Sequence, residues 1–307
     1  MTALAPAARG QRRLYIGMLV TLGLGWGMTQ PLGKMATMTG HGPFGLIFWQ
    51  LVVCVLVLGG LSAVRGKGLV LNRATLKFYV IVAVMGTLVP NATFYISAAK
   101  LPSGIMSIII SAVPMLAFPL ALLVGMERFA VKRLVGLLLG LAAVAIIAAP
   151  GAVLPDPAMA AFLPVALIGP LFYAMEATYV ARHGTAGLDA VQAMFGASVV
   201  GLLLCLPLTL ATGQFIDPLA GFGRPEAALV GSSVIHALMY AGYVWLASRA
   251  GSVFAAQCSY IVTGAGIFWA MALLGERFSP FVWLAVVLLL CGVALVNPRE
   301  TGRTTSV

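Results

Sequence analysis

Uncharged apolar segments of about 20 residues recur along this whole sequence, and each is long enough to cross the ~30 Å hydrocarbon core of a bilayer as a helix. Of the 307 residues, 61% are hydrophobic and only 8% are charged, whereas a soluble globular chain has about 25% charged residues. The segments do not alternate with a period of two in ten-residue blocks, which disfavours an outer-membrane barrel. The sequence therefore predicts an all-α integral membrane protein.

We expect ten transmembrane helices, joined by connections too short to hold a soluble domain. The first segment is too long, and too often interrupted by Gly, Gln and Pro, to be a cleaved signal peptide, so we interpret it as the first span. The expected spans are residues 14–36, 44–64, 76–99, 103–125, 132–149, 159–181, 188–211, 226–248, 252–274 and 280–297.

Lys and Arg divide unequally between the two sides of the membrane that ten spans define. Because basic loops stay in the cytoplasm, this predicts a multi-pass protein of the bacterial inner membrane with both termini cytoplasmic. The bases stand singly at the ends of segments, so the net charge of +10 does not indicate nucleic-acid binding. One side carries only Lys34, Lys100, Arg224 and Arg277 of the 18 bases. The other side carries Arg9, Arg12, Arg13, Arg65, Lys67, Arg73, Lys77, Arg128, Lys132, Arg133, Arg182, Arg249, Arg299 and Arg303.

The chain contains an internal repeat. The segment GMERFAVKRLVGLLLGLAAVAII, residues 125–147, aligns with GERFSPFVWLAVVLLLCGVALV, residues 275–296. Upstream, FYISAAKLPSG (94–104) aligns with GYVWLASRAGS (242–252), at an offset of 148 to 150 residues. Each half then holds five spans, an odd number, so the second half must be inserted upside down. This predicts two inverted five-helix repeats, 1–150 and 151–307, forming one membrane domain of the kind found in secondary transporters.

Several of these motifs resemble the drug/metabolite transporter superfamily, in its EamA-like branch. They are Trp26-Gly27, AAKLPSG and SAVPMLAFPLALLVGMERF in the first half, and LASRAGS and LLGERFSP in the second. The resemblance covers nearly the whole chain and implies a ten-span secondary carrier, in most cases an exporter of amino acids or other small metabolites. It also implies a cavity lined mainly by spans 1, 3, 4, 6, 8 and 9, with spans 5 and 10 packed behind. Two features depart from the pattern: Gly-Met-Glu replaces Gly-Glu in the first half, and span 1 adds Gln30 and Pro31.

Motifs of soluble catalysis are missing from the sequence. It has no phosphate-cradling Gly-Lys-Ser/Thr loop, no HExxH, no Gly-x-Ser-x-Gly elbow and no cluster of metal ligands. We therefore expect no enzyme activity, no cofactor, no metal and no ATP-driven pumping by this chain alone.

Glu176 is a carboxylate inside an expected span, which costs about 2.5–3.5 kcal/mol on insertion scales. One interpretation is that it faces a water-filled cavity, where it binds a substrate amine or a proton. The alternative is a hydrogen bond to a neighbouring helix or contact with the cytoplasmic interface. Burial favours the neutral form of a carboxyl group, so Glu176 is a candidate for proton coupling, and His236, a histidine deep in a span, is a second candidate.

Other polar and aromatic side chains share helix faces with small residues in spans 1, 3, 4, 6, 8 and 9. A buried polar group needs a hydrogen-bond partner, which either helix packing or a substrate could provide, and both interpretations stay open here. Spans 2, 5, 7 and 10 carry few polar side chains. The full expected substrate-binding set is Trp26, Gln30, Asn91, Tyr95, Ser111, Tyr173, Glu176, His236, Tyr240, Gln257 and Tyr260.

Glu127 and Glu276 occupy corresponding hairpins of the two halves, next to Arg128 and Arg277. We expect structural roles, in which each glutamate pairs or caps locally. The alternative is that they latch a gate, because they mark opposite ends of the inverted halves.

The sequence predicts a secondary transporter that moves a small polar, amino-acid-like metabolite by alternating access, with export favoured. An importer of an aromatic vitamin such as riboflavin, or of a nucleobase-like solute, is the alternative because the expected lining is rich in rings. A channel or a non-transporting membrane scaffold is a further alternative, and an intramembrane enzyme is disfavoured. The expected partners are a small-molecule substrate and the lipid bilayer, with a proton as a candidate coupling ion. Monomer and homodimer both stay open.

Overall fold

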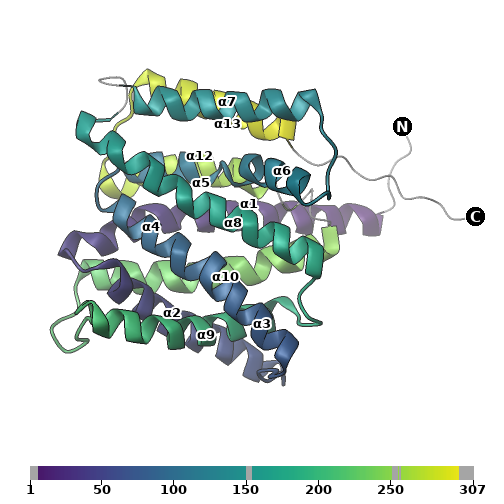
Figure 1. Cartoon of the computed structure of the whole chain (residues 1–307), viewed down its shortest axis with the longest axis vertical. Helices are drawn as coiled ribbons and strands as arrows, with labels where there is room; N and C mark the ends of the chain where they lie inside the picture. The colour runs from purple at the N-terminus through teal and green to yellow at the C-terminus, as the bar shows by residue number, and fades with distance from the viewer. Residues whose placement is uncertain (1–5, 150–153, 251–254, 256, 297–307) are drawn as a thin grey trace, which may run out of the picture.

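The computed structural model describes residues 6–149, 154–250, 255 and 257–296, and those residues contain helices and loops but no β-strand. The first described turns of α1 and the last of α13 lie at the same end of the bundle (Figure 1). We call this the terminal end and the other the distal end. The expected start of the ninth span at Ser252, the boundary between residues 150 and 151, and the bases Arg299 and Arg303 lie outside the described residues.

Each of the ten expected spans contains at least one described helix. The first half comprises α1 (Pro6–Ala36), η1 (Thr37–Thr39), α2 (Pro43–Val64), α3 (Arg73–Val82), η2 (Ala83–Leu88), α4 (Val89–Ala98), α5 (Ser103–Ile110), α6 (Val113–Leu123) and α7 (Val131–Ala148). The second half comprises η3 (Pro157–Phe162), α8 (Leu163–His183), α9 (Ala190–Ala211), α10 (Arg224–Ala250), α12 (Cys258–Leu274) and α13 (Pro280–Val296).

Seven stretches of the described chain are long and apolar enough to cross a membrane, and two shorter apolar helices, α12 and Pro280–Leu295 of α13, follow them. The prediction of an all-helical membrane protein is confirmed at this level. The number of ten spans and the direction of insertion stay predictions.

The third and fourth expected spans each form a helical rod that is interrupted near a proline. The third rod comprises α3, η2 and α4, and the fourth comprises α5 and α6. In the third rod, η2 is a π-helix that ends just before Pro90 of α4. Proline has no N–H to donate to the carbonyl four residues earlier, here that of Gly86, and π turns are frequent at functional sites. The fourth rod breaks between α5 and α6, just before Pro114.

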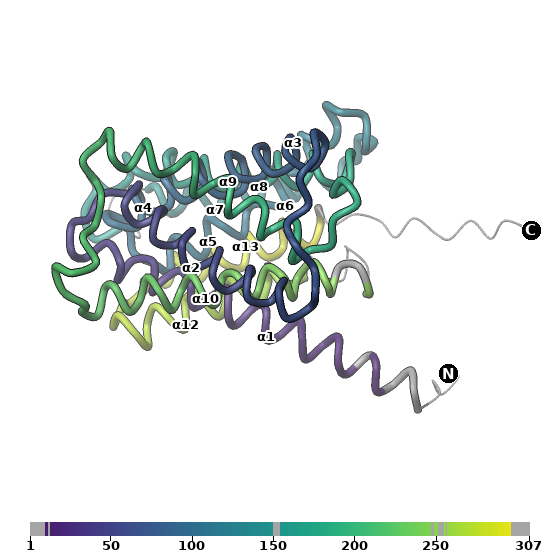
Figure 2. Tube along the Cα trace, turned by 90° about the horizontal axis from the view of Figure 1, so that it is seen from below, coloured from purple at the N-terminus to yellow at the C-terminus, as the bar shows by residue number. Residues whose placement is uncertain are grey.

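The helices lie side by side in layers along the long axis of the molecule (Figures 1 and 2). At one edge α7 packs on α13, the peripheral position that the resemblance implies for the fifth and tenth spans. At the other edge α2 packs on α9. Between these edges α1 contacts α10 and α12, and α8 contacts α4, α5 and α6. The polar residues expected to form the site lie mostly on these central helices.

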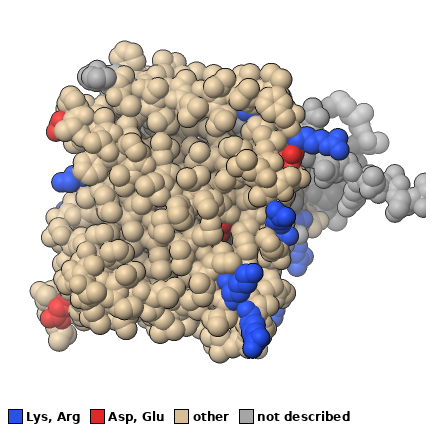
Figure 3. All heavy atoms as spheres, viewed as in Figure 1, with Lys and Arg blue, Asp and Glu red and all other residues tan. Residues whose placement is uncertain are grey.

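Most charged side chains lie at the two ends of the bundle, and the broad surface between them is largely uncharged, with an acidic group visible near its middle (Figure 3). In this view most of the basic groups lie at the terminal end, near the start of α3. Large apolar side chains such as Leu56, Leu138 and Val287 are more than half exposed on the intervening surface. An exposed apolar belt of this kind is what a surrounding bilayer requires.

Candidate functional site

Glu176 is 5% exposed and lies on α8, facing η2 and α10. Its Oε1 accepts a hydrogen bond from the Tyr240 hydroxyl of α10, at 3.3 Å. Within the described residues no Lys, Arg or His forms an ion pair with it. The bond to Tyr240 is the interhelical contact that one sequence interpretation expected. The lack of a basic partner leaves the charge available for a cationic group or a proton.

Gly86 of the π-helix makes room for the Glu176 carboxyl group. A Cβ atom placed on Gly86 would lie 2.5 Å from Oε2 and 2.6 Å from Cδ of Glu176. No alanine fits there unless the carboxyl group moves. The sequence interpretation missed Gly86, because a glycine in an apolar span has no signal that separates packing from function.

Three of the expected aromatic residues are connected to this carboxylate: Tyr240 directly, Trp26 through Tyr240, and Tyr173 as a neighbour on α8. Tyr173, one turn before Glu176 on α8, donates a long hydrogen bond of 3.5 Å to Oδ1 of the buried Asn91 on α4. Trp26 of α1 packs edge-on against Tyr240, with ring centroids 6.2 Å apart. We call Trp26, Asn91, Tyr173, Glu176 and Tyr240 the Glu176 cluster. The residues of this cluster come from four helices, α1, α4, α8 and α10.

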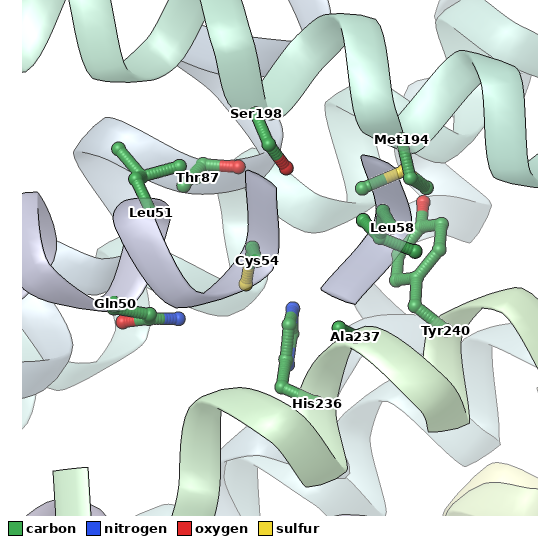
Figure 4. Close-up of a pocket in the computed structure, with 10 residues that line it drawn as sticks. All are labelled: Gln50, Leu51, Cys54, Leu58, Thr87, Met194, Ser198, His236, Ala237 and Tyr240. Carbon is green, nitrogen blue, oxygen red and sulfur yellow. The ribbon is translucent and has the colours of Figure 1, made fainter. Parts of the chain in front are cut away.

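A small cavity lies beside this cluster, between α2, η2, α9 and α10 (Figure 4). The space open to the centre of a water molecule is about 10 Å³, which holds about one water. Gln50 of α2 lies on its wall and accepts a hydrogen bond from Tyr95 at 2.9 Å. The lining residues are Gln50, Leu51, Cys54, Leu58, Thr87, Met194, Ser198, His236, Ala237 and Tyr240.

Spans 2 and 7 contribute more to this region than the sequence interpretation expected. Gln50 of α2 and Ser198 of α9 are both buried on the cavity wall. Gln50 could have been found by the argument used for Glu176, since an amide inside an apolar span must also find a partner. Ser198 carries a weaker signal, because a serine can bond its own helix.

Three expected site residues lie apart from the Glu176 cluster, and for a fourth, Gln30, no contact with the cluster is described. Ser111, directly after α5, donates to the Ser107 carbonyl at 2.9 Å and accepts a hydrogen bond from Thr263, so its hydroxyl contributes to the α5–α12 contact. Gln257 is exposed just before α12, and Tyr260 packs against the apolar core around α5, α6, α7 and α13. Gln30 is half-buried, and its Oε1 has no partner in the described structure.

Glu276 joins the distal end of the second half to the first half. Its carboxylate accepts hydrogen bonds at the start of α5 from the Ser103 N–H (2.7 Å), the Ser103 hydroxyl (2.9 Å) and the Gly104 N–H (3.0 Å). On the same end, the Lys34 ammonium donates to the carbonyls of Ala98 (2.8 Å) and Leu101 (2.7 Å). The expectation that Glu276 pairs or caps locally is wrong as to place: the carboxylate caps α5 of the other half, because the free N–H groups at the start of that helix bind it.

Glu127 at the terminal end differs from its repeat counterpart. It forms an ion pair with Arg133 of α7, at 2.7 Å, and the Arg133 guanidinium lies 5.3 Å from the Phe118 ring centroid. Glu127 thus pairs within its own half, as expected, but with Arg133 rather than Arg128. Of the two hairpin glutamates, only Glu276 has a described contact that crosses between the halves.

Nothing in the described part of the chain gathers three or more His, Cys, Asp or Glu side chains as a metal site would. The site therefore offers one carboxylate, several hydroxyl groups, amides and aromatic rings. These groups suit the binding of a polar or cationic organic solute.

The profile of the EamA-like transporter family matches the chain twice, over residues 13–149 and 161–297. No curated protein sequence matches it. A solved crystal structure, described only as that of a protein, is similar with a TM-score of 0.64 and 16% sequence identity, covering 92% of this chain and 97% of its own. At that identity the likeness concerns the fold alone.

Proposed function

Because the chain belongs to the EamA-like transporter family, we propose that it is a secondary transporter that moves a small polar metabolite by alternating access. The observation that supports this proposal most is Glu176. It is a buried carboxylate without a basic partner in the described structure, and it lies between helices of both halves. An unpaired intramembrane carboxylate is expensive, and such groups mark substrate or ion pathways.

The helix contacts support two halves related by a two-fold axis, and the odd number of expected spans in each half makes that relation an inversion. If the halves are related by a two-fold axis in the membrane plane, each contact between two helices should recur between the two equivalent helices of the other half. The contacts of α1 with α10 and α12 correspond to those of α8 with α4 and with the α5–α6 rod. The α2–α9 and α7–α13 contacts are each their own counterpart. This pairing supports the architecture in which substrate binds near the midplane between repeats.

The distal contacts support a carrier rather than an open channel. The cavity beside Tyr240 has room for about one water, so a metabolite can enter this cavity only if the helices around it separate. Glu276 and Lys34 bind the start of α5 and the end of α4 at the distal end. We interpret the structure as a state closed at that end, where Glu276 acts as the gate latch that the sequence left as an alternative.

The substrate we propose is amino-acid-like, with an ammonium group that meets Glu176, and the direction we propose is export from the cytoplasm of a bacterium. We also propose that both termini lie in the cytoplasm, because most of the basic residues in view in Figure 3 lie at the terminal end. The tilted pair of Trp26 and Tyr243, with centroids 5.3 Å apart, favours a second candidate, import of an aromatic solute that stacks on these rings.

Flux into and out of reconstituted vesicles, measured over a panel of amino acids, vitamins and nucleobases, tests the proposal. Glu176→Gln keeps the shape of the side chain and removes its charge, so we expect flux of the preferred amine to fall by about tenfold or more, equivalent to about 1.4 kcal/mol. Asp217→Asn, on the exposed loop before α10, makes the same change from carboxylate to amide away from the Glu176 cluster and should transport normally. Absence of flux for every solute by the wild type would contradict transport, and ionic currents far above carrier rates would indicate a channel.

A further inference from the structure

Several of the polar side chains that line the small cavity between α2, η2, α9 and α10 have no hydrogen-bond partner among the described protein atoms. Across the described residues, the side chains of Thr87, Ser198 and His236 have no hydrogen-bond partner in the protein. Gln50 uses its Oε1 for the Tyr95 hydroxyl, which leaves its amide N–H groups. Figure 4 shows the Gln50 amide, the Ser198 hydroxyl and the His236 ring directed toward the same space.

Unsatisfied polar groups in an apolar span are costly, by about 1–3 kcal/mol each in proteins. A water molecule needs two to four polar partners and about one probe sphere of space, roughly 10–15 Å³. The cavity supplies donors from Gln50, hydroxyl groups from Thr87 and Ser198, an imidazole nitrogen from His236, and about 10 Å³. A hard cation such as Na⁺ prefers a shell of oxygen ligands, and two of these four groups present nitrogen.

We infer that this cavity is a binding site for one ordered water molecule, and that this water makes His236 a second protonatable group of the Glu176 site. Tyr240 connects the cavity with Glu176, because it lines the cavity and its hydroxyl donates a hydrogen bond to Glu176. His236 and Tyr240 lie one helical turn apart on α10, with ring centroids 6.2 Å apart. The role of the water in transport rests on the proposed function, whereas its presence does not.

The protonation of His236 and that of Glu176 are then linked through one hydrogen-bonded network. Protonated His236 would stabilise ionised Glu176, and a substrate ammonium at Glu176 would favour neutral His236. The other titratable groups near this network are Tyr240 and Tyr243 on α10, Tyr173 on α8, Tyr95 on α4 and Cys54 on α2. At neutral pH these phenol and thiol groups are ordinarily uncharged, so the linkage involves His236 and Glu176.

The test uses Ser198→Val, whose larger side chain fills the cavity and removes a hydroxyl, with Ser198→Ala as the control that leaves the space open. A structure at a resolution that shows waters should contain density in the cavity of the wild type and of Ser198→Ala, but not of Ser198→Val. An empty cavity in the wild type would overturn the inference. Density that strengthens with Rb⁺ or Tl⁺ would also overturn it, in favour of a cation site.

Histidine-selective ¹⁵N NMR tests the linkage without any transport assay. His41→Gln and His183→Gln leave His236 as the remaining histidine of the sequence. In that background Glu176→Gln should shift the His236 titration, and the shift should be at least halved when Ser198→Val is also present. An equal shift in both backgrounds would overturn the linkage. Failure of the proposed function would instead appear as no flux with the water and the linkage intact.

Discussion

At the scale of single residues, Glu176 occupies its position because Gly86 lacks a side chain. The two lie on different helical rods, and the carboxyl group fills the space that a Cβ atom would take. The obstructed atoms belong to the end of a flexible side chain, so an added methyl group displaces Glu176 more easily than it separates the helices.

We therefore expect Gly86→Ala to lower flux by about tenfold or more, about 1.4 kcal/mol, while the thermal midpoint in detergent stays near that of the wild type. Alanine at a helical glycine position is otherwise favourable by about 0.5–1 kcal/mol. Gly231→Ala on α10, where nothing lies within 4 Å of the added atom, should keep normal flux. A loss of folding rather than of flux in Gly86→Ala would show that Gly86 serves packing.

At the scale of elements, a cluster of ions joins α2 to α9 at the terminal end. Asp189 caps the start of α9 by accepting from the N–H groups of Val191 (3.0 Å) and Gln192 (3.1 Å). Its carboxylate also binds Arg65 (2.9 Å) and Lys67 (2.7 Å), which follow α2. Burial alone would raise the pKa of Asp189, but the hydrogen bonds from Lys67 and Arg65 lower it well below its ordinary value.

A carboxyl group with a lowered folded-state pKa stabilises the fold above its unfolded pKa of about 3.9, and this contribution is lost as the pH falls through the folded pKa. We expect the thermal midpoint of the wild type to fall below about pH 4. Asp189→Asn should have a lower midpoint at pH 7 and a shallower fall below pH 4. Asp156→Asn, at a cap without an ion pair in the described structure, is the control. Equal acid slopes for wild type and Asp189→Asn would contradict the assignment.

At the scale of the whole molecule, the two ends of the bundle differ although the repeat relates them. Glu276 crosses to the first half and holds the start of α5, whereas Glu127 stays within its own half. Loss of a helix cap costs about 0.5–2 kcal/mol, which is enough to shift an equilibrium between two closely balanced states by several-fold or more.

Glu276→Gln should accordingly open the distal end. Spin labels at the exposed positions Lys100 and Arg277, in a chain whose exposed Cys291 is replaced by Ala, report the distance between the two turns. We expect a longer or broader distribution in Glu276→Gln than in the parent, and no change in Asp217→Asn, because Asp217 is exposed and its described hydrogen bond is to the nearby Leu219 N–H. Identical distributions in the latch variant and the parent would contradict a gate at this position.

The sequence predicted the helical class and the apolar segments well. The length of an apolar segment is a local property of the sequence, and the thickness of the bilayer sets the length that a span needs. Each expected span overlaps a described helix. Most described ends differ from the expected ones by a few residues, but α1 begins at Pro6, well before the expected start at residue 14.

The sequence predicted eleven side chains at the site. Trp26, Asn91, Tyr173, Glu176 and Tyr240 from that set are linked by described contacts or by helix position, and their binding of a substrate stays a prediction. The sequence did not indicate which of the eleven would meet. It did not predict the π-helix at residues 83–88, whose geometry depends on what packs against it.

By itself, the sequence determined that this chain is a helical membrane protein with two related halves and a carboxylate that is costly to bury. Only the tertiary structure decided which groups meet that carboxylate and which glutamate crosses between the halves. The sequence placed Gln257 and Ser111 in the expected site on the same grounds as Tyr240. In the structure Gln257 is exposed, and Ser111 forms hydrogen bonds within the α5–α12 contact. Periodicity fixes the face of a helix on which a residue lies, whereas the rotation and depth of each helix follow from packing against all the others.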